Sequence, residues 1–411
     1  MGRPYRARGA LSMRSELRVG ILGAGIMGCS LALLLARRGV RVTLIDQASA
    51  PMSGASRWNE GKIHLGFLYA GDPSLATARK LLPGGLAFRR IVEELVGRSI
   101  EPAISRADDI FLAHRDSVAS AEAMGTYFAN VGELIRESGS GKNYLADLTN
   151  ARIGRLSSAE LSASTDSPDI VAGFAVPERS VQTHMLAEWF AEAIAAEPTI
   201  TTLMSHRITG VAASKSGWRV HSTPAVEATF DILVNALWEG RAAVDATAGV
   251  IDYEPWSYRY RLSLFARTAR ECDLPSVLVA TGPFGDIKNY NGRDLYLSWY
   301  PAGLLMECTD MNGRGAPAID AVSERTIVER TLSGLAPYIP NLRRALEGAQ
   351  FRIGGGWVVA PGGGSLADAT SDLHRRDRFG VRRSGSYISV DTGKYSTAPW
   401  LAQRIAEGVL G

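Results

Sequence analysis

Residues 18–28 read RVGILGAGIMG, and residues 41–46 read RVTLID. The first segment is an apolar strand followed by a Gly-x-Gly-x-x-Gly turn, and an apolar helix pattern continues from it to a glycine stop at Gly39. The second segment is another strand that ends in an acid, Asp46. This order of strand, turn, helix, strand and acid predicts the βαβ unit that holds a dinucleotide.

Each glycine of this turn has its own physical role. Gly23 allows the tight turn, Gly25 lets the backbone approach a pyrophosphate, and Gly28 lets the helix pack closely on the strand. The free amides and the positive end of the helix dipole then face the phosphates. We therefore expect a cofactor to contact the turn and Asp46 to accept hydrogen bonds from a ribose. The expected turn residues are Gly23, Ala24, Gly25, Ile26, Met27 and Gly28.

Length and composition indicate an ordinary globular protein. The 411 residues are 46% hydrophobic and 21% charged, with a formal net charge of +3. This length suggests about two to three domains, and the small net charge gives no reason to expect nucleic-acid binding. The apolar run 19–36 fits the nucleotide-binding unit better than a membrane span, because it contains glycines.

The cysteines and histidines give no sign of a metal site or a disulfide framework. The three cysteines form no Cys-x-x-Cys pair, and the six histidines lack metal-ligand spacing. We therefore expect no metal and a reducing cytoplasmic setting. We expect the arginine-rich residues 1–16 to form a disordered tail; an upstream start codon, with Met13 nearer the true start, is the other interpretation.

The remaining pattern predicts an α/β protein with a second, antiparallel sheet. The nearly all-apolar segment 230–236 is typical of a parallel strand covered on both faces. Residues 258–309 instead show long alternating strands, with 294–300 and 303–308 expected to pair. We expect a discontinuous nucleotide-binding domain, formed by residues 17–80, 150–250 and 351–411. Residues 81–149 and 251–350 are expected to form the substrate or cap domain.

Two further segments contain chemistry suited to a flat cofactor. Residues 53–66 read SGASRWNEGKIHLG, and these small residues let backbone amides approach the edge of an isoalloxazine ring. Residues 391–399 read DTGKYSTAP and lead into the last predicted helix, with Thr397 as the expected N-cap. Lys394 beside this helix start would stabilise the negative charge of a reduced flavin.

These segments resemble the FAD-dependent oxidoreductases of the D-amino-acid oxidase superfamily, which includes glycine oxidase, sarcosine oxidase and glycerol-3-phosphate dehydrogenase. The resemblance is strongest at residues 23–28, 54–61, 234–240 and 393–399. It implies a Rossmann-like FAD-binding domain, with the flavin between this domain and the antiparallel sheet. Besides the turn and Asp46, the expected FAD-binding residues are Gly54, Ala55, Ser56, Asn59, Gly61, Lys62, Ile63, Ala236, Gly393, Lys394, Tyr395, Ser396 and Thr397.

The substrate side departs from the amino-acid oxidases. Many of them hold the substrate carboxylate with an arginine in a Gly-x-Arg-Pro segment, whereas residues 351–361 here read FRIGGGWVVAP. Arg352 therefore stands before the glycines. We expect Lys394 and His64 as candidate catalytic residues. The candidate substrate-binding residues are Arg352, Arg261, Tyr260, Tyr300 and Tyr290.

The resemblance implies oxidation of a small polar substrate, an amino acid, an amine or a sugar derivative. Hydride would pass from a C–N or C–O bond to flavin N5, with O₂ or another electron acceptor. The alternatives are a dehydrogenase that uses a quinone or protein carrier, a non-redox flavoenzyme such as a sugar mutase, an FAD-stabilised subunit without activity, and an NAD(P)-dependent enzyme. We expect no nucleic-acid partner and no integral membrane segment.

Overall fold

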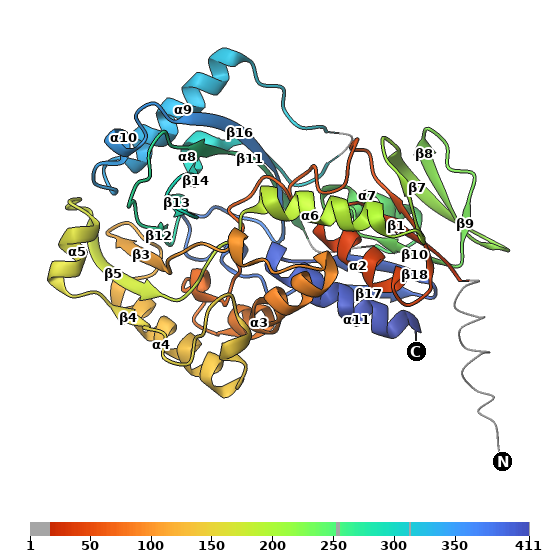
Figure 1. The fold of residues 1–411 in the computed structure, drawn as a ribbon, viewed down its shortest axis with the longest axis horizontal. Helices are drawn as coiled ribbons and strands as arrows, with labels where there is room; N and C mark the ends of the chain where they lie inside the picture. The colour runs from red at the N-terminus through yellow and green to blue at the C-terminus, as the bar shows by residue number, and fades with distance from the viewer. Residues whose placement is uncertain (1–16, 252–254, 312–313, 411) are drawn as a thin grey trace.

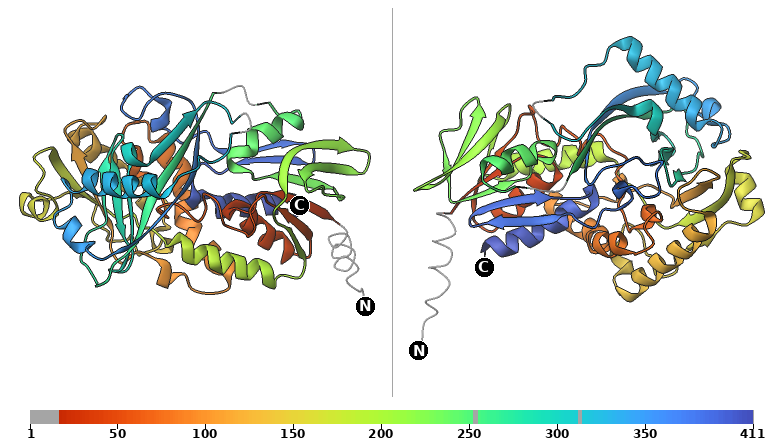
Figure 2. Two further views of the ribbon diagram at one scale, coloured as in Figure 1. Left: turned by 90° about the horizontal axis from the view of Figure 1, so that it is seen from above. Right: turned by 180° about the vertical axis from the view of Figure 1, so that it is seen from behind.

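The computed structural model describes residues 17–251, 255–311 and 314–410, which form two large sheets and one small one (Figure 1). The expected tail, residues 1–16, lies outside the described residues. Figure 2 shows the same arrangement from above and from behind, with the two large sheets at opposite ends of the molecule.

In the described part of the chain, the first sheet has six strands in the order β17-β18-β10-β1-β2-β6. Strands β6, β2, β1, β10 and β18 run parallel, and β17 is antiparallel to β18. Their residues alternate between two apolar layers, since Val19 and Ile21 pack toward α2 while Leu22 packs toward α7. The strands are β1 (Arg18–Leu22), β2 (Arg41–Ile45), β6 (Ile200–Leu203), β10 (Ile232–Asn235), β17 (Gly380–Ser384) and β18 (Tyr387–Asp391).

Helices cover one face of this sheet, and a small three-stranded sheet with α7 covers the other (Figure 1). Every residue of α2 is buried, because α11 and α6 pack on its outer side. The helices are α2 (Ile26–Ala36), α3 (Ala76–Val96), α6 (Thr183–Ala196), α7 (Arg241–Thr247) and α11 (Ala398–Leu410). The small sheet consists of β7 (Arg207–Ser214), β8 (Gly217–Thr223) and β9 (Thr229–Phe230).

The second sheet has nine strands among the described residues and is antiparallel except where β12 lies parallel to β3. Its longest strand, β11 (Trp256–Arg267), pairs along its full length with β16 (Gln350–Pro361). The other strands are β3 (Asp109–His114), β4 (Gly154–Arg155), β5 (Ile170–Val176), β12 (Val277–Ala280), β13 (Gly285–Asn289), β14 (Asp294–Trp299) and β15 (Leu304–Cys308).

Five helices and six short 3₁₀ turns complete the described fold. The helices are α4 (Ala121–Glu137), α5 (Ser158–Ser164), α8 (Tyr300–Gly303), α9 (Ala321–Leu335) and α10 (Leu342–Ala345). The 3₁₀ turns are η1 (Phe67–Tyr69), η2 (Glu101–Ala103), η3 (Gly141–Asn143), η4 (Trp238–Gly240), η5 (Asp372–His374) and η6 (Tyr395–Thr397).

The observed pairing confirms the fold class and differs from the sequence prediction in three places. β14 and β15 do not pair with each other, because α8 separates them and both pair with β11. β4, β5 and β16 belong to the second sheet, although residues 150–250 and 351–411 were expected in the nucleotide-binding domain. The expected boundary at residue 80 falls inside α3, which continues through Pro83. The division into two domains remains our proposal.

The predicted glycine turn depends on very close contact between β1 and α2. Gly23 has a φ of +99°, a backbone angle that residues other than glycine rarely adopt. A Cβ placed on Gly28 would lie only 1.8 Å from the Gly23 carbonyl oxygen. The helix therefore approaches the strand as closely as the backbone permits, and its first amides lie next to the ends of the parallel strands.

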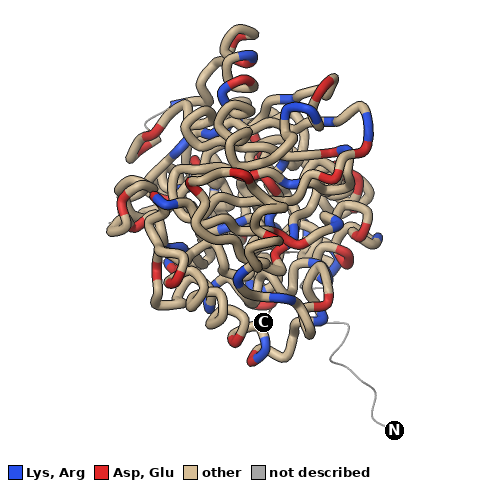
Figure 3. Tube along the Cα trace, turned by 90° about the vertical axis from the view of Figure 1, so that its left-hand side faces the viewer, with Lys and Arg blue, Asp and Glu red and all other residues tan. Residues whose placement is uncertain are grey.

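The surface carries both charge signs. Figure 3 shows Lys and Arg interspersed with Asp and Glu on the side it displays. Among the described residues no helix is long and apolar enough to cross a membrane, and no His, Cys, Asp or Glu group is arranged to hold a metal ion.

Candidate active site

A cavity of about 890 Å³ opens at the carboxyl ends of the parallel strands. The residues that directly follow β1, β2, β10 and β18 all line it: Gly23, Asp46, Ala236 and Thr392. Open parallel sheets bind their ligands at this edge. The cavity then continues along the middle of β16, so that both large sheets border it.

Most of the predicted cofactor-binding residues line this cavity. They are Gly23, Ala24, Gly25, Ile26, Met27, Asp46, Gly54, Ala55, Ser56, Asn59, Lys62, Ala236, Gly393, Lys394 and Tyr395. Five others lie behind its wall: Gly28, Gly61, Ile63, Ser396 and Thr397. Ile63, for example, is fully buried, and its amide donates to the Arg179 carbonyl.

Asp46 holds the glycine turn in place. Its Oδ2 accepts a hydrogen bond from the Ala24 amide at 2.6 Å, and its Oδ1 accepts from the Ala48 amide at 2.7 Å. Ser56 Oγ accepts from the Ile26 amide at 3.0 Å, which ties the small-residue segment to the start of α2. The carboxylate that was expected to bind ribose therefore also shapes the turn around the diphosphate position.

In the 391–399 segment, Lys394 lines the cavity and the Thr397 side chain bonds to the backbone of Lys394. The Lys394 ammonium lies 5.6 Å from the centre of the Tyr69 ring. The Thr397 hydroxyl donates to the Lys394 carbonyl at 2.8 Å and accepts from its amide at 3.3 Å. Thr397 thus closes η6, which precedes α11, whereas the sequence had suggested that it caps the last helix.

His64 lies in the cavity wall and is neutral. Burial, together with the nearby charges of Lys394 and Lys62, holds the pKa of His64 well below its usual value. Its Nδ1 lies 3.9 Å from Oε2 of Glu178, which is completely buried. The other Glu178 oxygen accepts from the amides of Leu65 and Gly66, at 2.6 and 3.1 Å. Glu178 therefore fixes the backbone that carries His64.

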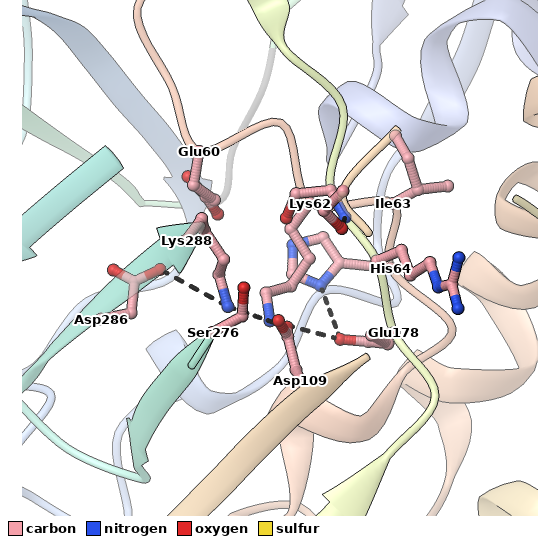
Figure 4. Close-up of polar contacts among 12 residues, drawn as sticks. Glu60, Lys62, Ile63, His64, Asp109, Glu178, Ser276, Asp286 and Lys288 are labelled. Atoms are coloured by element: carbon pink, nitrogen blue, oxygen red, sulfur yellow. Dashed lines mark hydrogen bonds and ion pairs between the residues drawn. The ribbon is translucent and has the colours of Figure 1, made fainter. Parts of the chain in front are cut away.

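A cluster of buried charges joins the 53–66 segment to the second sheet (Figure 4). Asp109 on β3 binds the ammonium groups of both Lys62 and Lys288, the latter at 2.8 Å. Lys288 also lies 3.9 Å from Asp286. Burial disfavours the charged form of Lys62, yet the attraction of Asp109 and Glu178 outweighs it and raises the pKa of this lysine. The cluster therefore fixes Lys62 between the cavity and the second sheet.

The predicted substrate-binding residues separate into different environments. Tyr260 lines the cavity. The Arg261 guanidinium lies over the Tyr300 ring at 4.4 Å. Tyr290 is buried and donates to the Glu60 carbonyl at 3.0 Å. Arg352 is exposed on β16 opposite Phe265 and is not among the residues that line the cavity.

Arg376 is one of several cavity-lining residues that the sequence prediction left out. It belongs to the charge run 374–378, which is usually a solvated loop, although an anion-binding rim was the other interpretation. Here Arg376 is buried and lines the cavity, because its amide donates to Thr77 Oγ1 on α3 at 2.9 Å. The neighbouring Arg375 stays half-exposed and pairs with Asp377 at 2.6 Å.

An aromatic group borders the cavity at β16. The Trp58 ring lies against Gly354, where an added Cβ would come within 1.9 Å of it. The His184 ring packs edge-on against Trp58 and Phe265, with centroid distances of 4.6 and 4.7 Å. Burial and the nearby Arg57 and Arg352 lower the pKa of His184 to about 4.

Comparison with known proteins identifies the family. The model of the FAD dependent oxidoreductase family, DAO, matches residues 18–358, and the chain therefore belongs to this family. It is an FAD-dependent oxidoreductase enzyme. The residues present fit the cofactor: the glycine cradle and Asp46 suit the ADP half, and the cavity extends from them past Lys394.

Solved structures share the fold over nearly the whole chain. Glycine oxidase from Geobacillus kaustophilus superimposes with a TM-score of 0.67 at 16% identity, covering 95% of this chain and 94% of that one. FAD-bound L-α-glycerophosphate oxidase from Mycoplasma pneumoniae gives a TM-score of 0.57 at 15% identity, covering 96% and 94%.

The curated relatives match a short segment only. The tRNA 5-methylaminomethyl-2-thiouridine biosynthesis bifunctional protein MnmC of Ralstonia nicotianae is 52% identical over 44 residues, which are 11% of this chain and 7% of that protein. The equivalent protein of Marinobacter nauticus is 50% identical over 58 residues, 14% and 9% of the two chains. The chain thus matches less than a tenth of these relatives' length.

We predict that Asp109→Asn lowers the free energy of unfolding by about 3–5 kcal/mol, because both buried lysines lose their shared counter-charge. Urea denaturation followed by circular dichroism measures the change. The matched control is Asp108→Asn, whose carboxylate is 43% exposed and pairs with Arg179; it is expected to cost less than about 1 kcal/mol. Equal effects of the two substitutions would contradict a stabilising role for the cluster.

We also predict that stability falls as the pH drops from about 6.5 towards 4. The folded protein keeps His184 neutral because its pKa is lowered to about 4, whereas His184 in the unfolded chain takes up a proton below its ordinary pKa of 6.5. His64 acts with the same sign. Urea denaturation at several pH values should show a smaller drop for His184→Gln than for the wild type. An unchanged pH dependence in that variant argues against a neutral, buried His184.

Proposed function

We propose that this enzyme oxidises a small polar substrate at a C–N or C–O bond, with Lys394 and His64 at the reacting end of the cofactor cavity. FAD, when bound, supplies the electron acceptor for this reaction. The observation that carries the proposal is the set of residues that line one cavity. The glycine turn and Asp46 line it together with His64, Lys394 and Arg376.

The two candidate catalytic residues suit different tasks. The lowered pKa of His64 favours the neutral imidazole, which can accept a hydrogen bond from a substrate hydroxyl or ammonium group and take up its proton as the substrate becomes more acidic on losing hydride. Glu178 fixes the backbone that follows His64 through the Leu65 and Gly66 amides. Lys394 carries its positive charge at the cavity and stabilises negative charge that develops beside it.

The remaining predicted site residues have supporting roles in this proposal. The cavity-lining members of the turn and of the 53–62 segment hold the diphosphate and the flavin, while Gly28, Gly61, Ile63, Ser396 and Thr397 support that wall from behind. Tyr260 borders the cavity on β11. Arg352 is exposed, and we assign it no contact with substrate.

We predict that one class of small polar compounds bleaches the bound flavin without oxygen. The panel comprises amino acids, N-methyl amines, amino sugars and hydroxy acids, and absorbance near the visible flavin bands is recorded in a stopped-flow instrument. With the active class, His64→Gln should slow flavin reduction by about 10²–10⁴-fold at unchanged FAD content. His221→Gln, at an exposed position on β8, is the control and should reduce at the wild-type rate.

The same experiment separates the alternatives. Hydrogen peroxide formed in air identifies an oxidase, and reduction without peroxide identifies a dehydrogenase with another acceptor. A flavin that stays oxidised while the substrate is converted indicates a non-redox reaction and contradicts the proposal. Equal reduction rates for His64→Gln and the wild type would remove His64 from the reaction.

A further inference from the structure

Three arginines near the cavity lack an acidic partner. Arg259 and Arg376 are buried, with 3% and 6% of their surfaces exposed, and Arg261 is half-buried. Among residues 17–251, 255–311 and 314–410, no carboxylate oxygen lies within 4.0 Å of any of their nitrogens. The buried Arg241, by contrast, pairs with Asp245 at 2.9 Å.

Tyrosine hydroxyls and rings hold these guanidinium groups in place. Arg259 Nη1 donates to the Tyr300 hydroxyl at 3.0 Å, and Arg261 lies over the Tyr300 ring at 4.4 Å while it donates to Ser298 Oγ at 3.3 Å. Arg376 is close enough to Tyr69, Tyr300 and Arg259 for these side chains to shift its pKa. Two parts of the chain, β11 and the 374–378 run, therefore bring three cations close together.

Several polar atoms in this group have no hydrogen-bond partner in the described structure. They are Nε of Arg259, Nε of Arg261 and the hydroxyl of Tyr69. Each is buried, and a buried donor without a partner is costly. Donors left open on neighbouring side chains are what a bound anion would use.

Two acids lie nearby, but neither is within ion-pair distance of these arginines, although the charge of Asp391 attracts Arg376. Asp391 accepts from the Gly393 amide at 2.9 Å, and Asp286 accepts from Ser298 at 2.7 Å and lies 3.9 Å from Lys288. Burial lowers the pKa of Arg376, and repulsion by Arg259 adds to this effect, although Tyr69 and Asp391 oppose it. Asp391 thus offsets part of the buried positive charge, but among the described residues no carboxylate oxygen lies within ion-pair distance of these guanidinium groups, so a bound anion would lower the cost of burying them.

We propose that Arg259, Arg261 and Arg376 form a recognition site for a doubly negative small molecule, carrying either one phosphate or two carboxylates. The inference rests on the proposed function, because Arg376 lines the same cavity and Arg259 and Arg261 flank Tyr260, which also lines it. Three guanidinium groups exceed what one carboxylate can neutralise, and their planar donors match oxyanions. The exposed Arg352 takes no part.

The test measures anion binding to the FAD-loaded protein at constant ionic strength. The probes are inorganic phosphate, succinate, acetate and uncharged succinamide, and the readouts are the unfolding temperature and the visible flavin spectrum. A ligand that binds the folded state raises the unfolding temperature. Phosphate or succinate should bind at least tenfold more tightly than acetate, and succinamide should have no effect. The site recognises a phosphate if inorganic phosphate binds more tightly than succinate, and two carboxylates if succinate binds more tightly.

Variants locate the site. Arg259→Met and Arg376→Met should each weaken dianion binding at least tenfold. The control is Arg267→Met, on the same face and strand as Arg259, where the side chain is 62% exposed and pairs with Asp294 at 2.7 Å; it should bind like the wild type. If the Arg376→Met variant loses FAD, the dianion affinity of the Arg259→Met variant alone tests the site.

The site is rejected if no dianion stabilises the wild type, if acetate binds equally well, or if Arg259→Met keeps full dianion affinity. A different result would contradict the proposed function alone. If the wild-type protein binds a dianion at these arginines but no compound of the panel reduces its flavin, the anion site stands and the proposed oxidation is wrong. The unfolding-temperature readout does not require a reduced flavin, so the two failures are distinguishable.

Discussion

The close contact between β1 and α2 is the constraint on which the cofactor site depends. Gly23 turns with a positive φ, Gly28 leaves no room for a side chain, and Asp46 accepts the Ala24 amide at 2.6 Å. Because four of the five parallel strands end here, this contact places helix amides, an acid and the carboxyl ends of those strands around one cavity. A bulky residue at Gly28 would move α2 away from that position.

A second constraint links the cofactor segment to the antiparallel sheet. Lys62 and His64 belong to a loop from the first sheet's side, whereas Asp109 and Lys288 lie on strands of the second. Glu178 holds two amides of the same loop. The buried charges therefore connect this loop to the second sheet. They also set the electrostatics of the cavity wall, where His64 is kept neutral while Lys62 stays charged.

Local patterns predicted the βαβ unit and its glycine turn, because the glycines, the ends of β1 and β2 and Asp46 lie within about thirty residues and each has a backbone reason. That these residues bind the cofactor stays a prediction. The substrate side depends on contacts distant in sequence. Arg376 stands in a charge run typical of a solvated loop, and only the Thr77 contact on α3 draws it inward. Glu178 and Asp109 are single acids without any motif. Arg352 looked suitable beside its glycines, but strand alternation on β16 leaves it exposed.

The central claim is that separate segments of the chain enclose one FAD, with its diphosphate at the start of α2. Titration of the flavin-free protein with FAD, followed by flavin fluorescence and by the cofactor content after gel filtration, tests it most directly. The account predicts one FAD per chain for the wild type and none for Gly28→Val that remains folded by circular dichroism. A folded wild-type protein that takes up no FAD, or a Gly28→Val variant that binds it with equal affinity, would contradict the account.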